Sequence, residues 1–416
     1  MSDSSRNWLH GLLIWAFLLF VVTSTFSIAL AQLSLGFSLL LFIIIAIRDR
    51  YNPFAGPAKL VYLFIALYLA WLLLSSMLVE PPLRALTNCR EEWLFLAIPI
   101  GIYLMRERIY REKFVTGFAV AIGLVSLYAV IQYITGTHWL HFSGGSFSPA
   151  PIVKPAGNFT HWLTFANYYA AAALFLFGYI IFNAGLSPVR FRLALAASVL
   201  AMIAVVLTSS RTPIAAIVIA LLVCISFKSG KFRIVTIGLV AIVLILAALL
   251  PASREKFGGT LQRDTSAEYE GSRVYIWTRS LDIIKEHPLF GVGQGNFKEE
   301  YVKRLPPDID ESRKHAHAHN DFLNVAAIAG IPGALFFLGI WAAVLRLVGK
   351  AAFDLRLSID RRRIALASLV GSVVFLMTSL TEATFADEEV RQMLMFLWAA
   401  GLAVRYNDSA GLGQKP

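Results

Sequence analysis

The chain alternates between long apolar runs and short polar gaps along almost its whole length. Most runs approach the roughly 20 residues that a helix needs to cross the hydrocarbon core of a bilayer. The pattern predicts about 12 transmembrane helices, at residues 9–28, 30–47, 59–79, 93–105, 114–135, 161–183, 193–208, 213–227, 234–250, 322–345, 364–382 and 391–404. The fourth and the last are short. We therefore expect an all-α integral membrane protein folded as a polytopic bundle.

Basic residues are concentrated in alternate gaps between the runs, at residues 48–50, 106–113, 188–192, 228–233 and 346–363. Because cytoplasmic loops are enriched in Lys and Arg, these gaps are expected on the cytoplasmic side. Both termini then lie in the cytoplasm, and the other gaps face outward. The first run, from Trp8, has only Arg6 as a preceding positive charge and no small-residue cleavage site after it. It is expected to remain as a span and not to be removed as a signal peptide.

Composition agrees with this class, since 57% of the residues are hydrophobic, 15% are charged and the mean hydropathy is +0.67. These values lie outside the range of soluble domains. The formal net charge of +11 would suggest a nucleic-acid partner only if its placement in the gaps were ignored. We expect membrane lipids as partners and no nucleic acid. Cys89 lies near the outer end of one predicted span and Cys224 near the inner end of another, so no disulfide is expected.

One outward segment, residues 251–321 between the ninth and tenth spans, is too long for a structureless loop and should fold. Apolar residues recur in it at helical spacing, at Val274, Trp277, Leu281 and Ile284. They predict an amphipathic helix on the membrane surface that ends at Pro288. Asn296, followed by Glu299, could cap a second helix. The predicted organisation is spans one to nine in 1–250, the segment 251–321, and the last three spans with the C-terminus in 322–416.

A histidine cluster, His315, His317, His319, Asn320 and Asp321, stands immediately before the tenth span. It could be a solvated polar lead-in that caps the helix. It could bind a metal, since three alternating histidines line one face of a strand and Zn²⁺ accepts three imidazoles, although no carboxylate at a matching spacing completes such a site. In the third interpretation the cluster supplies a general base. If Asn320 or Asp321 opens a helix, His319 lies at its positive end, which favours neutral imidazole.

Two arginines are candidates for binding an anion. Arg211 follows Thr208, Ser209 and Ser210 between two apolar runs, where a charge is costly unless it is paired, lines a cavity or reaches the headgroups. Arg273 opens the amphipathic helix and could equally be a surface charge. Together the two guanidinium groups could bind a diphosphate bidentately. Arg90, Lys154 and His161, in or beside the outward gaps, are further candidates for the same site.

Glycines at 291, 293 and 295 form a Gly-x-Gly-x-Gly run. It is weak evidence for a nucleotide loop, because no βαβ unit precedes it and no Lys-Ser/Thr pair follows. It predicts a tight turn.

These motifs together resemble a known family. His319-Asn320, nine further residues, and then Gly330-Ile331-Pro332-Gly333 are similar to the signature of O-antigen ligases and related glycosyltransferases. The Ser210-Arg211 pair resembles the Ser-Arg of that superfamily, and the stretch from Arg273 to Phe297 resembles its segment before the histidine motif. The layout of about 12 spans with a long outward segment is also similar.

The resemblance implies a function. Family members transfer a glycan from undecaprenyl diphosphate to an acceptor on the periplasmic face of the bacterial inner membrane, with no metal, cofactor or nucleotide sugar. It implies His319 as the base, Arg211 and Arg273 as diphosphate ligands, Asn320, Gly330 and Gly333 as supporting motif residues, and inversion at the anomeric carbon. The clear histidine motif favours an O-antigen ligase, whose acceptor is lipid A-core.

Three alternatives to a ligase remain. A polymerase of the same superfamily would transfer the glycan to another lipid-linked repeat. A protein O-glycosyltransferase resembles a longer chain with an added soluble domain. A secondary transporter of an anionic solute would use Arg211 as its substrate site, but it would need acidic residues within the spans, and essentially none is evident.

Overall fold

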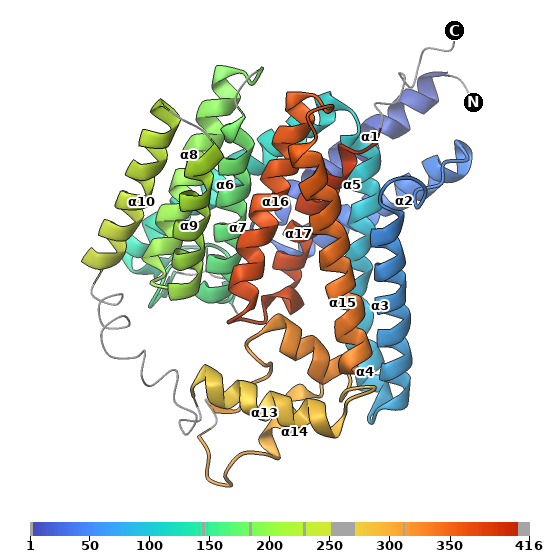
Figure 1. Ribbon diagram of the computed structural model, residues 1–416, viewed down its shortest axis with the longest axis vertical. Coiled ribbons are helices and arrows are strands. Elements are labelled where there is room, and N and C mark those ends of the chain that lie inside the picture. The colour runs from blue at the N-terminus through green and yellow to red at the C-terminus, as the bar shows by residue number, and fades with distance from the viewer. Residues whose placement is uncertain are drawn as a thin grey trace.

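The computed structural model describes residues 3–140, 142–143, 146–147, 149–182, 185–227, 230–250, 271–310 and 313–406. Over these residues the protein is nearly all helical (Figure 1). The strands among them are two antiparallel pairs, β1 (Thr137–His138) with β4 (Ala150–Pro151) and β2 (Phe142–Ser143) with β3 (Ser146–Phe147). The expected all-α class is confirmed.

Each apolar run has become a helix. In chain order they are α1 (Asp3–Thr23), α2 (Ile28–Arg48), α3 (Lys59–Leu78), η1 (Cys89–Leu96) continued by α5 (Ala97–Met105), α6 (Arg108–Thr135), α7 (Trp162–Ile181), α8 (Pro188–Leu207), α9 (Arg211–Cys224), α10 (Lys231–Leu249), α15 (Asp321–Phe353), α16 (Ile359–Ser379) and α17 (Glu388–Ala403). Short elements lie between them: α4 (Pro82–Asn88), η2 (Ile225–Phe227), α13 (Arg273–Glu286), α14 (Phe297–Val302) and η4 (Thr384–Ala386).

Eight helices are long and apolar enough to cross a membrane, namely α2, α3, α6, α7, α8, α10, α15 and α16. The apolar parts of α1 and α9 are shorter, as are α5 and α17. The protein is therefore a polytopic membrane protein, and four of the expected spans are short helices. Cys89 and Cys224 are both free and buried.

Helix α7 lies at the centre of the bundle and α10 at its edge. The apolar window of α7 is completely buried, whereas most of the α10 window is exposed, with Ile234 70% accessible. Small residues let the neighbours of α7 approach closely. A Cβ added at Gly178 would lie 3.0 Å from Ala367 Cα of α16, and Ser198 Oγ of α8 donates to Ala173 O at 2.8 Å.

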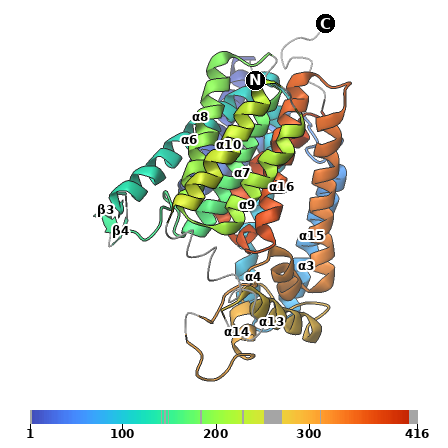
Figure 2. The same ribbon diagram turned by 60° about the vertical axis from the view of Figure 1, so that its left-hand side comes forward.

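The bundle has two different ends. The first turns of α1 and the last turn of α17 lie at the upper end in Figure 1, while α13 and α14 lie below the lower end. Figure 2 shows the same separation from a second direction. We call the lower end the histidine end, because it carries His319. The upper end is called the arginine end, after the arginines of the ion network described below. The first turns of α1 and the last turn of α17 thus lie at the end of the bundle opposite to α13 and α14.

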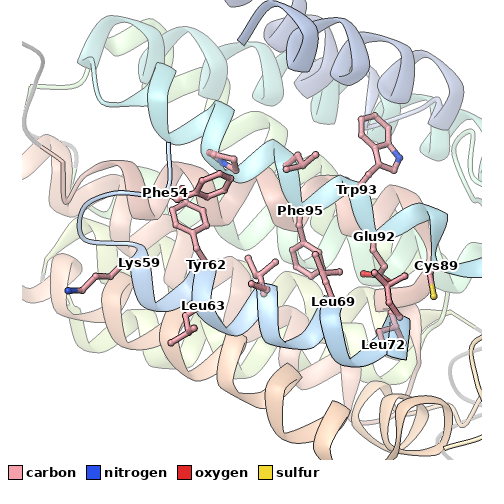
Figure 3. A pocket seen from close by; sticks show the side chains of 15 residues that line it. Phe54, Lys59, Tyr62, Leu63, Leu69, Leu72, Cys89, Glu92, Trp93 and Phe95 are labelled. Carbon is pink, nitrogen blue, oxygen red and sulfur yellow. The ribbon is translucent and has the colours of Figure 1, made fainter. Parts of the chain in front are cut away.

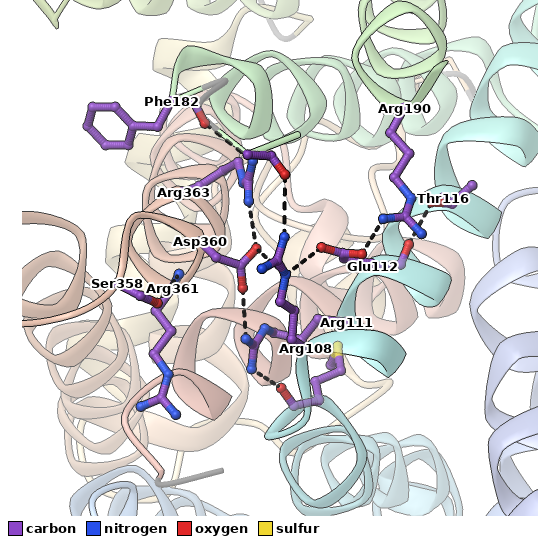
Figure 4. Close-up of polar contacts among 12 residues, drawn as sticks. Arg108, Arg111, Glu112, Thr116, Phe182, Arg190, Ser358, Asp360, Arg361 and Arg363 are labelled. Carbon is purple, nitrogen blue, oxygen red and sulfur yellow. Dashed lines mark hydrogen bonds and ion pairs between the residues drawn. The ribbon is translucent and has the colours of Figure 1, made fainter. Parts of the chain in front are cut away.

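A buried ion network closes the arginine end (Figure 4). Asp360 of α16 accepts from Arg111 of α6 at 2.8 Å and from Arg363 at 2.6 Å, and Glu112 of α6 pairs with Arg190 of α8. The pairs of Asp360 with Arg111 and Arg363 are buried, and removing one partner of a buried pair leaves an uncompensated charge, which typically costs about 3–5 kcal/mol. Several basic residues of these gaps therefore hold α6, α8 and α16 together, besides any effect they have on orientation.

The segment 251–321 forms helices where the spacing predicts them, although residues 251–270 lie outside the described residues. The buried face of α13 consists of Ile276, Ser280 and Ile283, and Leu281 is 44% exposed, so the predicted apolar stripe is displaced by about one position. The reason is that α13 packs against α15. Asn296 is the residue before α14, but its side chain does not cap the helix and donates to Val292 O at 2.9 Å.

Candidate active site

His319 and Arg273 meet at one buried carboxylate. His319 Nδ1 lies 2.9 Å from Glu382 Oε2, and Arg273 Nη2 donates to Glu382 Oε1. The side chain of Glu382 is 7% exposed and that of His319 is 14% exposed. The three residues come from the start of α13, the turn before α15 and the turn after α16. The structure thus brings together residues that are 109 and 63 positions apart in the sequence.

Local interactions explain why His319 points at Glu382. Asn320 is the N-cap of α15, and its Oδ1 accepts from the backbone N–H groups of Phe322 and Leu323 at 2.9 and 3.0 Å. Its Nδ2 donates to Leu380 O at 3.0 Å, which ties the start of α15 to the end of α16. His319 itself has a left-handed backbone, with φ of 50°, which is uncommon for a residue with a side chain. The expected helix start at Asn320-Asp321 is confirmed.

His319 is a neutral imidazole in this setting. Burial lowers its pKa to about 2, and the positive charge of Arg273 adds to this. The carboxylate of Glu382 would favour the imidazolium, but its charge is already compensated by Arg273. Burial also lowers the pKa of His315 to about 4 and that of His317 to about 3. A neutral imidazole oriented by a carboxylate can accept a proton from a hydroxyl group.

The other two histidines surround His319 but do not line a strand. His315 Nδ1 lies 3.2 Å from His319 Nε2, and the backbone N–H of His319 donates to His317 Nδ1 at 3.3 Å. Residues 315–319 have no strand pairing. Across the described part of the chain, no group of three His, Cys, Asp or Glu side chains is arranged to hold a metal ion. The histidines contact one another directly instead.

Arg211 stands at the first position of α9, at the same end of the bundle. The preceding turn is tight, with φ of 55° at Ser209. Thr381 Oγ1 donates to Thr212 Oγ1 at 2.9 Å, so the start of α9 lies beside the residue that precedes Glu382. The positive end of the α9 dipole reinforces the charge of Arg211. This is a favourable position for an anion.

His161 and Lys154 approach the same site. His161 is the N-cap of α7, stacks on Trp162 at 4.1 Å between ring centroids, and is close enough to His319 and Glu382 to affect the pKa of both. Lys154 Nζ lies 4.9 Å from the centre of the Trp162 ring. Arg90 is different. It is exposed on η1.

Gly330 and Gly333 have a structural role. Gly330 breaks α15 with φ 70° and ψ 179°, and a Cβ there would lie 2.0 Å from Leu289 O. The backbone groups around the kink pair with other segments: Val292 N–H with Ala327 O (2.9 Å), Gly293 N–H with Ile328 O (2.9 Å), Ile331 N–H with Pro288 O (2.8 Å) and Trp71 Nε1–H with Ala329 O (2.8 Å). A Cβ added at Gly333 would lie 2.5 Å from Ala329 Cβ and 3.3 Å from the Trp71 ring. Gly330 therefore lets the 288–293 segment dock on α15, and Gly333 lets Trp71 of α3 approach it.

The Gly-x-Gly-x-Gly run belongs to this docked segment. Gly291, Gly293 and Gly295 all have positive φ, between 66° and 85°. A Cβ at Gly291 would lie 2.5 Å from the backbone of Ile328. The run is thus a turn, as the sequence predicts, and the structure adds that it approaches α15 closely.

Glu382 is the site residue that sequence reasoning missed. It ends the apolar run 364–382, and it is an acidic residue at the edge of a predicted span, which is the available signal. An ionisable residue there is a functional candidate by default. The predicted span 364–382 therefore ends on a buried acidic residue, in the turn that follows α16.

Two cavities lie outside the histidine cluster. One, of about 650 Å³, follows α3 from Lys59 to Leu73 and is bounded on the other side by Trp93 and Phe95 (Figure 3). The other, of about 480 Å³, lies between the end of α3 and the α13–α14 connection. None of the lining residues of either cavity is a candidate catalytic or diphosphate-binding residue.

A comparison with known protein families gives a match in the region of the chain that contains the candidate site. Residues 196–338 match the family model described as O-antigen ligase, and this range contains Arg211, Arg273 and His319. The match covers about a third of the chain and confirms the resemblance to the O-antigen ligase superfamily. No curated protein matches the chain.

Proposed function

From the O-antigen ligase domain that residues 196–338 carry, we infer that this member of the O-antigen ligase and polymerase superfamily is a glycosyltransferase. We propose that it transfers a glycan from undecaprenyl diphosphate to lipid A-core, on the periplasmic face of the inner membrane. The observation that carries the proposal is the neutral, carboxylate-oriented His319 beside Arg273, within the matched range.

The acceptor hydroxyl is activated at the histidine cluster, with His319 as the base. Glu382 orients the imidazole through Nδ1 and stabilises the imidazolium that forms when a proton arrives. The acceptor oxygen then bonds to the anomeric carbon as the bond to the diphosphate oxygen breaks. Attack from the face opposite the leaving group inverts the configuration.

The diphosphate is stabilised by charge that is already in place. Arg211 at the start of α9 and Arg273 at the start of α13 bind its oxygens, with Lys154 and His161 as further donors. Fixed cations at the position where negative charge develops can supply several kcal/mol of transition-state stabilisation. Arg273 pairs with Glu382 in this structure. Its five N–H donors allow it to keep that pair while it reaches a phosphate oxygen.

The test is a transfer assay with the purified protein in detergent or liposomes. Lipid-linked glycan is offered together with lipid A-core or with a second lipid-linked repeat. We expect transfer to lipid A-core, its survival in EDTA, and near-complete loss in His319→Ala, because general-base assistance contributes about 10²–10⁴ in rate. His319→Gln should be equally inactive. Transfer only to the second repeat would indicate the polymerase, and loss in EDTA reversed by Zn²⁺ would indicate a metal enzyme.

The transporter alternative gains a buried carboxylate in Glu382 but remains weaker. Glu382 already accepts from Arg273 and contacts His319, so its charge is compensated within the protein. A protein that takes up an anionic solute but leaves the lipid-linked glycan unchanged would support it.

A further inference from the structure

Glu382, His319 and His315 form a continuous line of contacts. Glu382 Oε2 lies 2.9 Å from His319 Nδ1, and His319 Nε2 lies 3.2 Å from His315 Nδ1. The far nitrogen of His315, Nε2, is shielded from solvent and has no hydrogen-bond partner among the described residues. The nitrogen of His319 that would act as the base is therefore already occupied by a second imidazole.

The positions of the protons along Glu382, His319 and His315 follow from the interactions of Glu382. Burial raises the pKa of Glu382, and the positive charge of Arg273 opposes this. Arg273 can only donate, so its pair with Glu382 favours the carboxylate, which then accepts from His319. The proton of neutral His319 is then on Nδ1, and its Nε2 is an acceptor. His315 must donate to it from Nδ1. One lone pair in the two rings is left over, and it is on His315 Nε2.

We propose that the acceptor hydroxyl delivers its proton to His315 Nε2, and that His315 passes its own Nδ1 proton to His319. This rests on the proposed glycosyl transfer and names the atom that receives the proton. As the acceptor oxygen bonds to the anomeric carbon, its proton moves to His315 Nε2 and the His315 Nδ1 proton moves to His319 Nε2. The positive charge comes to rest on His319 beside Glu382, and the electron pair of the broken bond leaves with the diphosphate.

The shielding of Nε2 has a chemical use. The ring of Tyr301 from α14 lies 5.9 Å from that of His315 between centroids. The lone pair on His315 Nε2 is kept from bulk water in this structure. A base that water cannot reach does not promote hydrolysis of the donor.

The experiment measures transfer by His315 variants in the assay above. His315→Gln can still donate a hydrogen bond to His319 but cannot relay a proton, and we expect its rate to fall by about 10²-fold. His315→Ala leaves a space, and added imidazole should restore its rate. The restored rate should increase with the pKa of the added azole, from triazole to imidazole to 4-methylimidazole, because the azole takes the proton. His287→Gln, an exposed histidine at the end of α13, is the matched control and should match wild type.

The outcomes separate the relay from the function on which it rests. A wild-type rate in His315→Gln, with His319→Ala inactive, would overturn the relay and leave His319 as the direct base. Equal restoration by azoles of different pKa would also overturn it, because filling a space does not depend on basicity. Full activity in His319→Ala would instead overturn the proposed function. Expression and retention of lipid-linked donor are measured for each variant, so that a folding defect is recognised.

Discussion

Glu382 engages Arg273 with one carboxylate oxygen and His319 with the other. A residue from the turn after α16 thereby connects the proposed diphosphate ligand to the proposed base. A substitution at Glu382 cannot change the diphosphate ligand and the base independently, because any change in the charge or length of this side chain affects both Arg273 and His319.

Substitution of Glu382 is the most direct consequence. Glu382→Gln keeps the shape but can donate to His319 Nδ1, which forces the other tautomer. We expect a loss of transfer on the order of 10²–10⁴-fold, since misorientation and the wrong tautomer both impair a general base. Transfer rate is the measurement, with retention of lipid-linked donor as the control. An active Glu382→Gln protein would mean that the carboxylate only holds Arg273.

The arginines test recognition of the diphosphate. Arg→Lys keeps the charge but removes the planar fork, so Arg211→Lys and Arg273→Lys should each weaken donor binding strongly while membrane expression stays normal. Arg84→Lys is a matched control, because Arg84 pairs with Glu299 in an exposed position. Donor retention and transfer are measured side by side. A wild-type rate in either site variant would show that this arginine is a surface or headgroup charge.

The pH dependence follows from the lowered pKa of His319. An ordinary imidazole would be half protonated near pH 6.5 and would lose basic function below it. Burial and Arg273 lower the pKa of His319 to about 2, so it remains neutral as the pH falls. We expect the transfer rate to change little between pH 7.5 and 5.5. A rate that halves near pH 6.5 and tracks one ionisation would contradict the burial of this imidazole.

The same shift has a consequence for stability. Because the folded-state pKa is below the unfolded value, the unfolded chain binds the proton more readily. The contribution of neutral His319 to stability is present above pH 6.5 and decreases as the pH falls below it. His319→Gln should flatten this part of the stability profile.

Gly330 tests the coupling of α13 to α15. A Cβ there would lie 2.0 Å from Leu289 O, and the backbone conformation is one that side chains rarely adopt. Gly330→Ala should destabilise the protein by at least about 1–3 kcal/mol and reduce transfer. Gly349→Ala is the control in the same helix, since nothing lies within 4 Å of the added Cβ, and it should be neutral or slightly stabilising. Thermal unfolding in detergent distinguishes the two, and equal midpoints would contradict the close approach.

Orientation is tested by reporter fusions. Alkaline phosphatase is active only outside the cytoplasm. A fusion near Asp308 should therefore be active and a fusion after Lys350 inactive. The reverse pattern would place the histidine end in the cytoplasm and overturn periplasmic transfer.

The features that the sequence did not predict are those that depend on contacts between helices far apart in the chain. Runs of apolar residues predict the helices well, because the bilayer imposes their length and composition. Asn320 was identifiable as a cap, because capping is local. The pairing of Arg273 with Glu382 depends on how α13 lies across the end of α16, and no local pattern encodes that placement. The buried face of α13 was misplaced for the same reason, since α15 determines which side of the helix is covered.

The break at Gly330 divides α15 into two unequal parts. A straight helix of its 33 residues would be about 50 Å long, well beyond a hydrocarbon core of about 30 Å. The part after Gly330 alone is sufficient to cross. A thicker or thinner bilayer would then change the tilt of that part, while the first turns, bonded to the 288–293 segment, stay in register with α13. His319 is thereby insulated from hydrophobic mismatch, and its geometry should be the same in membranes of different lipid composition.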